Sequence, residues 1–261
     1  MTDGADAASA AVWVEEVGRR DGPLVVLVHG TMDRGTGMAR VARRLRDRAR
    51  VIIYDRRGYG RSRALGGPYT MAPHADDLIE LLAGRPAVLV GHSMGGNVAL
   101  AAASRHPELV LAVLVYETPL SWAPWWPLAT AGAVALAAGE EPGHGDPAGD
   151  AAEAFLRRML GRERWEQLPE RVRLARRAEG PVLVGELRDA RHEMPFSVER
   201  IVAPVAVARG EHAHPHHVQA CAALAEMFTT EVVVLPGAGH AAPVTHPDEL
   251  AALVSREVLE G

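Results

Sequence analysis

The stretch AVLVGHSMGGNVALAAASRHP, residues 87–107, decides the fold of this chain. Its first four residues, Ala87–Val90, are apolar as in a buried strand, and the Ala-rich residues Asn97–Arg105 predict a helix. Between them, Gly91-His92-Ser93-Met94-Gly95 matches the pattern G-x-S-x-G. A strand and a helix can meet so closely only if the residues two positions either side of the serine lack bulk. We therefore expect Ser93 in a strained turn, with its hydroxyl toward the carboxyl ends of the strands.

Short apolar runs alternate with amphipathic or Ala-rich stretches on both sides of this turn. Leu24–Val28 is continuously apolar, as buried parallel strands are, whereas Val12–Val17 alternates in polarity as an exposed strand does. This alternation of strands and helices indicates an α/β fold, with a mostly parallel sheet covered on both faces. The predicted strands are Val12–Val17, Leu24–Val28, Val51–Tyr54, Ala87–Val90, Leu111–Tyr116, Val205–Ala208 and Glu231–Leu235. The predicted helices are Met38–Arg48, His74–Leu82, Asn97–Arg105, Val218–Met227 and Pro247–Leu259.

The alternation stops in the middle of the chain, where a short apolar stretch, Pro181–Val184, is the nearest approach to a strand. The Arg-rich stretches Ala151–Gly161 and Glu170–Glu179 predict helices there. Long insertions are tolerated where a loop leaves a sheet, and they often cover a site. We therefore divide the chain into an α/β core of residues 1–117 and 203–261 and a small helical cap of residues 118–202.

The composition of the chain excludes several classes of function. Its 261 residues, 48% of them hydrophobic, suit one large α/β domain with an insertion. A formal charge of −5 is too small to indicate a nucleic-acid or acidic-lipid partner. The sequence contains no lysine, which excludes Schiff-base chemistry on lysine and a Walker-type phosphate loop. The single cysteine, Cys221, excludes an intrachain disulfide.

The first residues, MTDGADAASA, are small and acidic and lack the basic start and apolar run of a secretory signal. The stretch that comes closest to a membrane helix, Leu128–Ala138, is shorter than the roughly 18 residues that such a helix needs. We therefore expect a cytoplasmic protein with no membrane association.

Four landmarks in a fixed order make the chain similar to the α/β-hydrolase superfamily over nearly its full length. They are His29-Gly30 after the first buried strand, Asp55–Ser62 after the next, the Gly91–Gly95 turn, and Gly237-Ala238-Gly239-His240 after the last strand. The chain most resembles the compact esterase, lipase and haloperoxidase-like branch, which has a cap between the sixth and seventh strands. A serine at the turn argues against the aspartate-nucleophile branches, the haloalkane dehalogenases and epoxide hydrolases.

This resemblance implies that Ser93 is a catalytic nucleophile. A serine hydroxyl is a weak nucleophile until a base takes its proton, and His240 lies where family members place that histidine. Two backbone N–H groups must hold the developing oxyanion. Met94, the residue after the nucleophile, supplies one, and the resemblance assigns the second to Thr31.

The acid of the triad is the point at which this sequence departs from the family pattern. The family usually places Gly-Glu-x-Asp after the seventh strand, and here Gly210-Glu211-His212-Ala213 puts Ala213 at the aspartate position. Two carboxylates offer a replacement. Glu117 follows the strand Leu111–Tyr116, where some members place their acid, and Glu211 lies two residues before the usual position. We prefer Glu117 and keep Glu211 as the alternative acid.

Three tryptophans, Trp122, Trp125 and Trp126, stand at the start of the predicted cap. Large aromatic side chains there would line an apolar substrate pocket or, equally, pack the cap onto the core.

Four histidines cluster within six residues: His212, His214, His216 and His217. Such a cluster can bind Zn²⁺, but no cysteine or firm carboxylate accompanies it, and Pro215 breaks the helical spacing. We therefore expect a solvated loop there, and no metal ion or organic cofactor.

The leading prediction is a serine hydrolase that cleaves small to medium apolar carboxylic esters through an acyl-enzyme. Its partner is a small-molecule ester substrate. The same triad would also allow lactone, amide or carbon–carbon bond hydrolysis, or cofactor-free perhydrolysis. A weakly catalytic ligand-binding protein with the same fold is a further alternative, which Ala213 keeps open.

Overall fold

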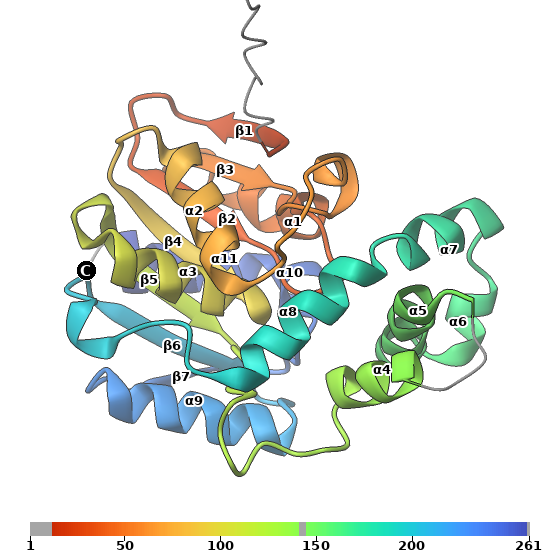
Figure 1. Cartoon of the computed structure of the whole chain (residues 1–261). Helices are drawn as coiled ribbons and strands as arrows, with labels where there is room; N and C mark the ends of the chain where they lie inside the picture. The colour runs from red at the N-terminus through yellow and green to blue at the C-terminus, as the bar shows by residue number, and fades with distance from the viewer. Residues whose placement is uncertain (1–11, 141–144, 260–261) are drawn as a thin grey trace, which may run out of the picture.

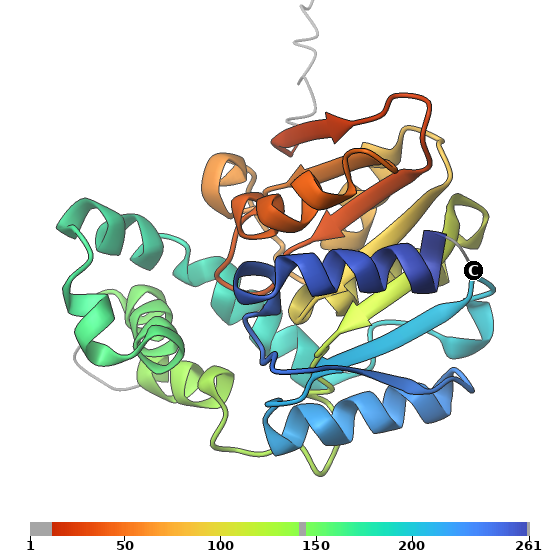
Figure 2. The ribbon, with the colours of Figure 1, turned by 180° about the vertical axis from the view of Figure 1, so that it is seen from behind.

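The structure is a computed structural model, and it describes residues 12–140 and 145–259. A seven-stranded sheet forms its centre, in the order β1-β3-β2-β4-β5-β6-β7, with helices on both faces (Figures 1 and 2). Strand β1 pairs antiparallel with β3 at one edge, and the other pairs are parallel. This is the α/β fold that the alternation of elements predicts. The strands are β1 (Val14–Gly18), β2 (Leu24–Val28), β3 (Arg50–Tyr54), β4 (Ala87–His92), β5 (Val110–Tyr116), β6 (Val205–Gly210) and β7 (Val232–Leu235).

Helices cover both faces of the sheet and form a group beside it. The α-helices are α1 (Gly35–Leu45), α2 (Met71–Leu82), α3 (Met94–Arg105), α4 (Ala131–Glu140), α5 (Pro147–Leu160), α6 (Arg162–Glu166), α7 (Glu170–Arg177), α8 (Gly180–His192), α9 (Pro215–Met227), α10 (Ala242–Thr245) and α11 (Pro247–Val254). Short 3₁₀ turns occur at Gly60–Ser62, Pro107–Leu109 and Val198–Arg200, and a π-helical turn at Ser255–Leu259 follows α11. In the part of the chain that the structure describes, none of these helices has the length and apolar character needed to cross a membrane.

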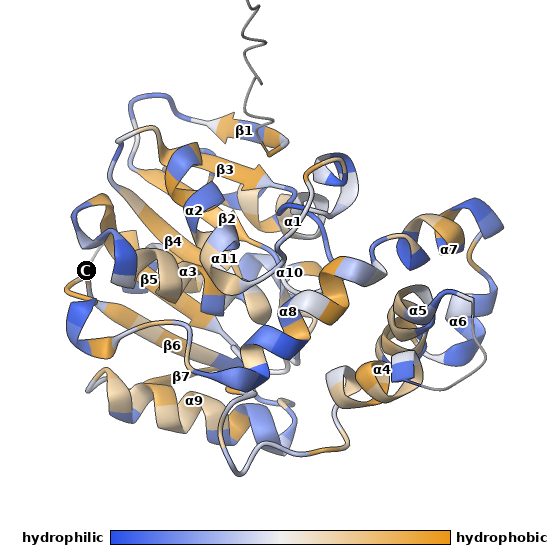
Figure 3. Ribbon diagram, in the orientation of Figure 1, coloured by the Kyte–Doolittle hydropathy of each residue, from blue (hydrophilic) through white to orange (hydrophobic). Residues whose placement is uncertain are grey.

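The central strands of the sheet are buried on both faces, which explains why they are continuous apolar runs. Strand β2 is buried along its whole length. Its residues Leu24, Val26 and Val28 belong to the apolar layer under α2, α3 and α9, whereas Val25 and Leu27 belong to the layer under α1, α10 and α11. Figure 3 shows the apolar colouring concentrated on these central strands.

Helices α4–α8 follow β5 and precede β6, and they lie together beside the sheet (Figure 1). They therefore come after the fifth of the seven described strands. Three of them, α4, α6 and α8, were not predicted. Helix α4 occupies part of the apolar stretch Leu128–Ala138, and Pro181–Val184 forms the start of α8, where a proline in the first turn is well tolerated.

A buried ion pair joins α8 to the core. Arg56 donates to Glu186 at 2.8 Å, and both side chains are almost fully buried. The same guanidinium donates to the carbonyl oxygens of His29 and Gly30 at 3.0 and 3.1 Å. The hydroxyl of Tyr59 donates to the other oxygen of Glu186 at 2.5 Å. This network fixes α8 against the loop that follows β2.

Candidate active site

Ser93 lies in a strained turn between β4 and α3. Its backbone has φ +53° and ψ −128°, a conformation that residues with a Cβ atom rarely adopt. The flanking glycines are required by close contacts. A Cβ atom at Gly95 would lie 2.2 Å from the carbonyl oxygen of Val28, and one at Gly91 would lie 2.4 Å from the Cα atom of Gly96. The G-x-S-x-G pattern thus allows the backbone approach that presents Ser93 at the end of the strand.

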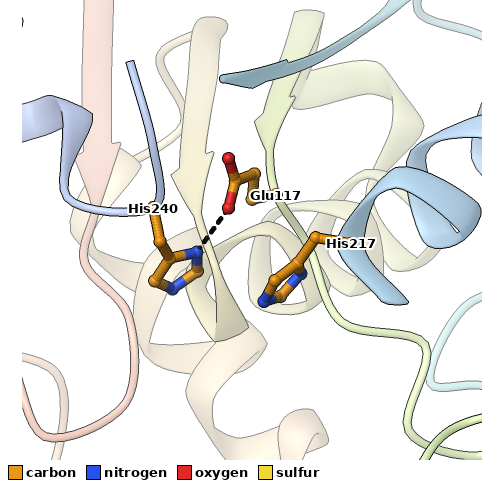
Figure 4. A group of neighbouring side chains, drawn as sticks. All are labelled: Glu117, His217 and His240. Carbon is orange, nitrogen blue, oxygen red and sulfur yellow. Dashed lines mark hydrogen bonds and ion pairs between the residues drawn. The ribbon is translucent and has the colours of Figure 1, made fainter. Parts of the chain in front are cut away.

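Glu117 and His240 come together from the ends of two different strands. Glu117 directly follows β5 with φ +48°, and His240 lies in the loop after β7 (Figure 4). The His240 Nδ1 atom is 2.8 Å from Glu117 Oε2. The other oxygen of Glu117 accepts from the Gly210 amide at 3.0 Å, and the carboxylate is fully buried. Both oxygens are therefore fixed, and Nδ1–H of the imidazole is the donor to Oε2.

Glu211, the alternative acid, points elsewhere. Its Oε2 atom accepts from the Gly237 amide at 2.8 Å, and its side chain is exposed. The structure therefore brings Glu117, and not Glu211, to His240. Ala213 offers no carboxylate.

The imidazole of His240 lies between two other histidine rings. The ring centroid of His92 is 4.8 Å away and that of His217 is 4.7 Å away, the latter nearly parallel at 18°. His92 Nε2–H donates to the His240 carbonyl at 2.8 Å. Burial lowers the pKa of His92 to about 3 and that of His217 to about 2. Both rings are therefore neutral at neutral pH, and neither opposes a positive charge on His240 with a charge of its own.

The histidine cluster differs from the solvated loop that we predicted. His214 precedes α9, which begins at Pro215, because proline suits the first turn of a helix. The ring of His216 lies 4.5 Å from that of His217, and Trp126 packs edge-on against both. The start of α9 thus packs against the candidate site, an arrangement that local sequence does not reveal.

Glu117, His217 and His240 place one potential metal-ligating atom each within 4.8 Å of one another (Figure 4). Imidazole lone pairs lie in the plane of the ring, and the planes of His217 and His240 are nearly parallel. Lone pairs in two stacked planes do not converge on one ion, and Glu117 Oε2 already accepts from His240. The geometry suits a hydrogen-bonded carboxylate–imidazole pair better than a metal centre.

Thr31 and Met94, the predicted oxyanion donors, line the same cavity as Ser93. Met94 is the first residue of α3, so its amide has no partner within the helix. The loop before Thr31 is held by His29, whose Nδ1–H donates to the Gly30 carbonyl at 2.8 Å and whose Nε2 accepts from the Arg56 amide at 2.9 Å. His29 thus fixes the loop that precedes Thr31.

The cavity beside Ser93 has a volume of about 320 Å³ and is lined by both the core and the helices α4, α5 and α8. Of the three tryptophans, Trp126 lines it. Trp122 instead packs against Phe196, with ring centroids 5.9 Å apart, and Trp125 packs against Trp126. Further lining residues were not identified from the sequence: Phe155, Arg158, Met159 and Leu187. The first three lie on α5, which was predicted, and Leu187 lies on α8, which was not. Only the packing of these helices shows which of their faces meets the cavity.

A model of the Alpha/beta hydrolase family matches residues 25–253, and the chain belongs to this family. The match agrees with the fold and with the order of the four landmarks. The thermophilic esterase of Thermogutta terrifontis, solved with malate bound, is similar to the chain at 25% identity and a TM-score of 0.70, over 95% of this chain and 93% of that one.

Curated relatives match over a shorter part. The 2-(acetamidomethylene)succinate hydrolase of Mesorhizobium japonicum is 36% identical over 99 residues, which are 37% of this chain and 36% of the relative. The bifunctional esterase/perhydrolase DCH of Acinetobacter calcoaceticus is 32% identical over 114 residues, 41% of each chain. The chain thus matches about two fifths or less of the length of these relatives.

Proposed function

We propose that this protein is a serine hydrolase that cleaves carboxylic esters with the triad Ser93, His240 and Glu117. The observation that carries the proposal is the 2.8 Å contact between His240 Nδ1 and the buried Glu117, in a cavity that His240 shares with Ser93. A fixed carboxylate on Nδ1 leaves Nε2 as the unprotonated nitrogen, the one that can accept a proton from a serine hydroxyl.

In the proposed reaction, His240 Nε2 takes the Ser93 Oγ proton as Oγ attacks the ester carbonyl carbon. The N–H groups of Thr31 and Met94 donate to the oxyanion of the tetrahedral intermediate. His240 then gives the proton to the leaving alcohol, and the acyl-enzyme remains on Ser93. Water attacks the acyl-enzyme with its proton passing to His240, which returns it to Ser93 as the acid leaves.

The Glu117 carboxylate supplies what Ala213 cannot. It holds the tautomer of His240 and stabilises the imidazolium that forms in each half-reaction. This role at the end of β5 supports an active hydrolase over a ligand-binding protein with a vacant acid position.

The apolar side chains of Phe155, Met159 and Leu187 in the cavity support ester substrates with a modest apolar part. The names of the relatives include both an esterase/perhydrolase and a hydrolase of 2-(acetamidomethylene)succinate. The test below uses an ester. Amides and lactones as substrates, and peroxide in place of water as the acyl acceptor, can be assayed with the same variants.

The test is hydrolysis of p-nitrophenyl butyrate by the wild type, Ser93→Ala and Glu117→Gln, with Glu211→Gln as the matched carboxylate control. We expect Glu117→Gln to lower kcat by roughly 10⁴-fold and Ser93→Ala by roughly 10⁶-fold. Glu211→Gln should stay within about twofold of the wild type, because its carboxylate contacts Gly237 and not His240. Equal losses in Glu117→Gln and Glu211→Gln would contradict the assignment of the acid. Wild-type turnover that survives in Ser93→Ala would contradict the proposal as a whole.

A further inference from the structure

The cavity beside Ser93 is lined by one cationic side chain, that of Arg158, and among the described residues by no aspartate or glutamate. The chain as a whole is acidic, with 33 Asp and Glu against 28 Arg. A lining with an arginine and without a carboxylate therefore differs in sign from the rest of the molecule. An anion that enters this cavity meets a cation and no opposing carboxylate from the walls.

Arg158 stands near the C-terminal end of α5, and among the described residues it has no charged partner. Its neighbour Arg157 contacts Glu153 at 2.8 Å and Glu166 at 3.0 Å. Arg177 contacts Glu153 at 2.8 Å as well. Within residues 12–140 and 145–259, by contrast, no hydrogen bond or ion pair engages the Arg158 guanidinium. The guanidinium is thus available to a ligand.

The surroundings of Arg158 combine apolar walls with access for a charged ligand. Phe155 on the same helix and Leu187 on α8 are buried and line the cavity, whereas Arg158 and Met159 are exposed. An ion pair with Arg158 would therefore be partly open to water, which makes it weaker than a fully buried pair. The first turn of α4 also lines the cavity, and the N-terminal end of a helix carries a partial positive charge.

From these contacts we infer that the preferred substrates are half-esters of dicarboxylic acids. Arg158 binds the free carboxylate through paired N–H donors while Ser93 attacks the ester carbonyl at the other end of the substrate. The inference rests on the proposed function and narrows it to a substrate class. Arg158 acts as a specificity-determining residue, since it contacts the substrate and takes no part in the bond changes.

The experiment compares monoethyl succinate, glutarate and adipate with the neutral ethyl succinamate, glutaramate and adipamate. Each pair has nearly the same shape and differs by one charge. We expect kcat/KM to favour the anionic ester by about tenfold for at least one chain length, the range of a charge-assisted hydrogen bond. The preference should shrink in 0.5 M NaCl, because salt screens a partly exposed pair.

Arg158→Gln should lower kcat/KM for the anionic esters by about tenfold relative to the neutral esters, which removes the preference, and Arg158→Lys should restore part of it. Arg162→Gln is the matched control, because Arg162 is an exposed arginine of α6 that does not line the cavity. It should keep the full preference. The same change in both variants would point to the net charge of the cap and overturn the assignment to Arg158.

A wild type with Ser93-dependent hydrolysis of p-nitrophenyl butyrate but no charge preference at any chain length would overturn this inference alone. A wild type with no Ser93-dependent hydrolysis of any of these esters would overturn the proposed function, and this inference with it.

Discussion

Acid should destabilise this protein in a pH range where most of its carboxylates are still ionised. Four histidines are buried around the site, and burial lowers the pKa of each: His29, His74, His92 and His217. For His92 the pKa falls from 6.5 to about 3, and for His217 from 6.5 to about 2. The folded state thus keeps these rings neutral, while the unfolded state protonates them below its pKa of 6.5.

The direction of the change in stability with pH follows from the number of protons that the folded and unfolded states bind. Because the folded pKa lies below the unfolded one, the contribution of each ring to stability is complete above pH 6.5. It is lost progressively as the pH falls toward the folded pKa, which is about 3 for His92 and about 2 for His217. At pH 5.5 an unfolded histidine with a pKa near 6.5 is about nine-tenths protonated, which favours the unfolded state by about 1.4 kcal/mol. The two rings of His92 and His217 together favour the unfolded state by roughly 3 kcal/mol at this pH, and His29 and His74 act in the same direction. This is a sizeable part of the 5–15 kcal/mol that is typical of a folded domain.

The assay is urea denaturation between pH 7.5 and 5.5, with the free energy of unfolding extrapolated to water. His74→Leu should weaken the pH dependence, because burial lowers the pKa of His74 well below 6.5. Both nitrogens of His74 are buried without a hydrogen-bond partner, so the substitution breaks no hydrogen bond. The exposed His192 serves as the control, and His192→Gln should leave the dependence unchanged. A free energy of unfolding that does not change with pH over this range would show that the buried histidines do not control acid stability. An unchanged pH dependence in His74→Leu would contradict the role of His74.

Two substitutions test the ion pair that holds α8 and the turn that carries Ser93. Glu186→Gln should lower the free energy of unfolding by about 3–5 kcal/mol, because it leaves Arg56 as an uncompensated buried charge. Chemical denaturation measures this free energy, and a loss below about 1 kcal/mol would mean that the pair does not hold α8. Gly95→Ala should lower the melting temperature and the soluble yield, because the new Cβ atom would lie 2.2 Å from the Val28 carbonyl oxygen, and overpacking of this kind costs about 1–3 kcal/mol or more. Wild-type stability in Gly95→Ala would show that the turn can relax.

The strands were predictable because each is a local pattern. β2 and β5 are apolar runs that the sheet buries on both faces, so their sequence alone identifies them. The predicted helices begin too far along the chain. α3 begins at Met94 and α9 at Pro215, each about a turn earlier than expected, because the first turns contain glycine or proline and carry no apolar period.

The candidate site was predictable where it depends on strand ends. Ser93, Glu117 and His240 each follow a strand of one parallel sheet, and such ends meet at the same edge. The residues that surround these three side chains could not be predicted from the sequence, because their positions depend on packing between distant segments. His217 reaches His240 across α9, and Arg158 reaches the cavity from α5, and neither carries a local signal that separates it from its neighbours.

Activation of Ser93 by Glu117 and His240 can be measured as the rate at which a fluorophosphonate labels the protein, with the modified residue located by mass spectrometry. We expect a single adduct on Ser93 in the wild type and labelling at the wild-type rate in Glu211→Gln. In Glu117→Gln, labelling should be slowed by about 10²-fold or more. A wild type that is not labelled on Ser93, or a Glu117→Gln variant labelled as fast as the wild type, would contradict this activation.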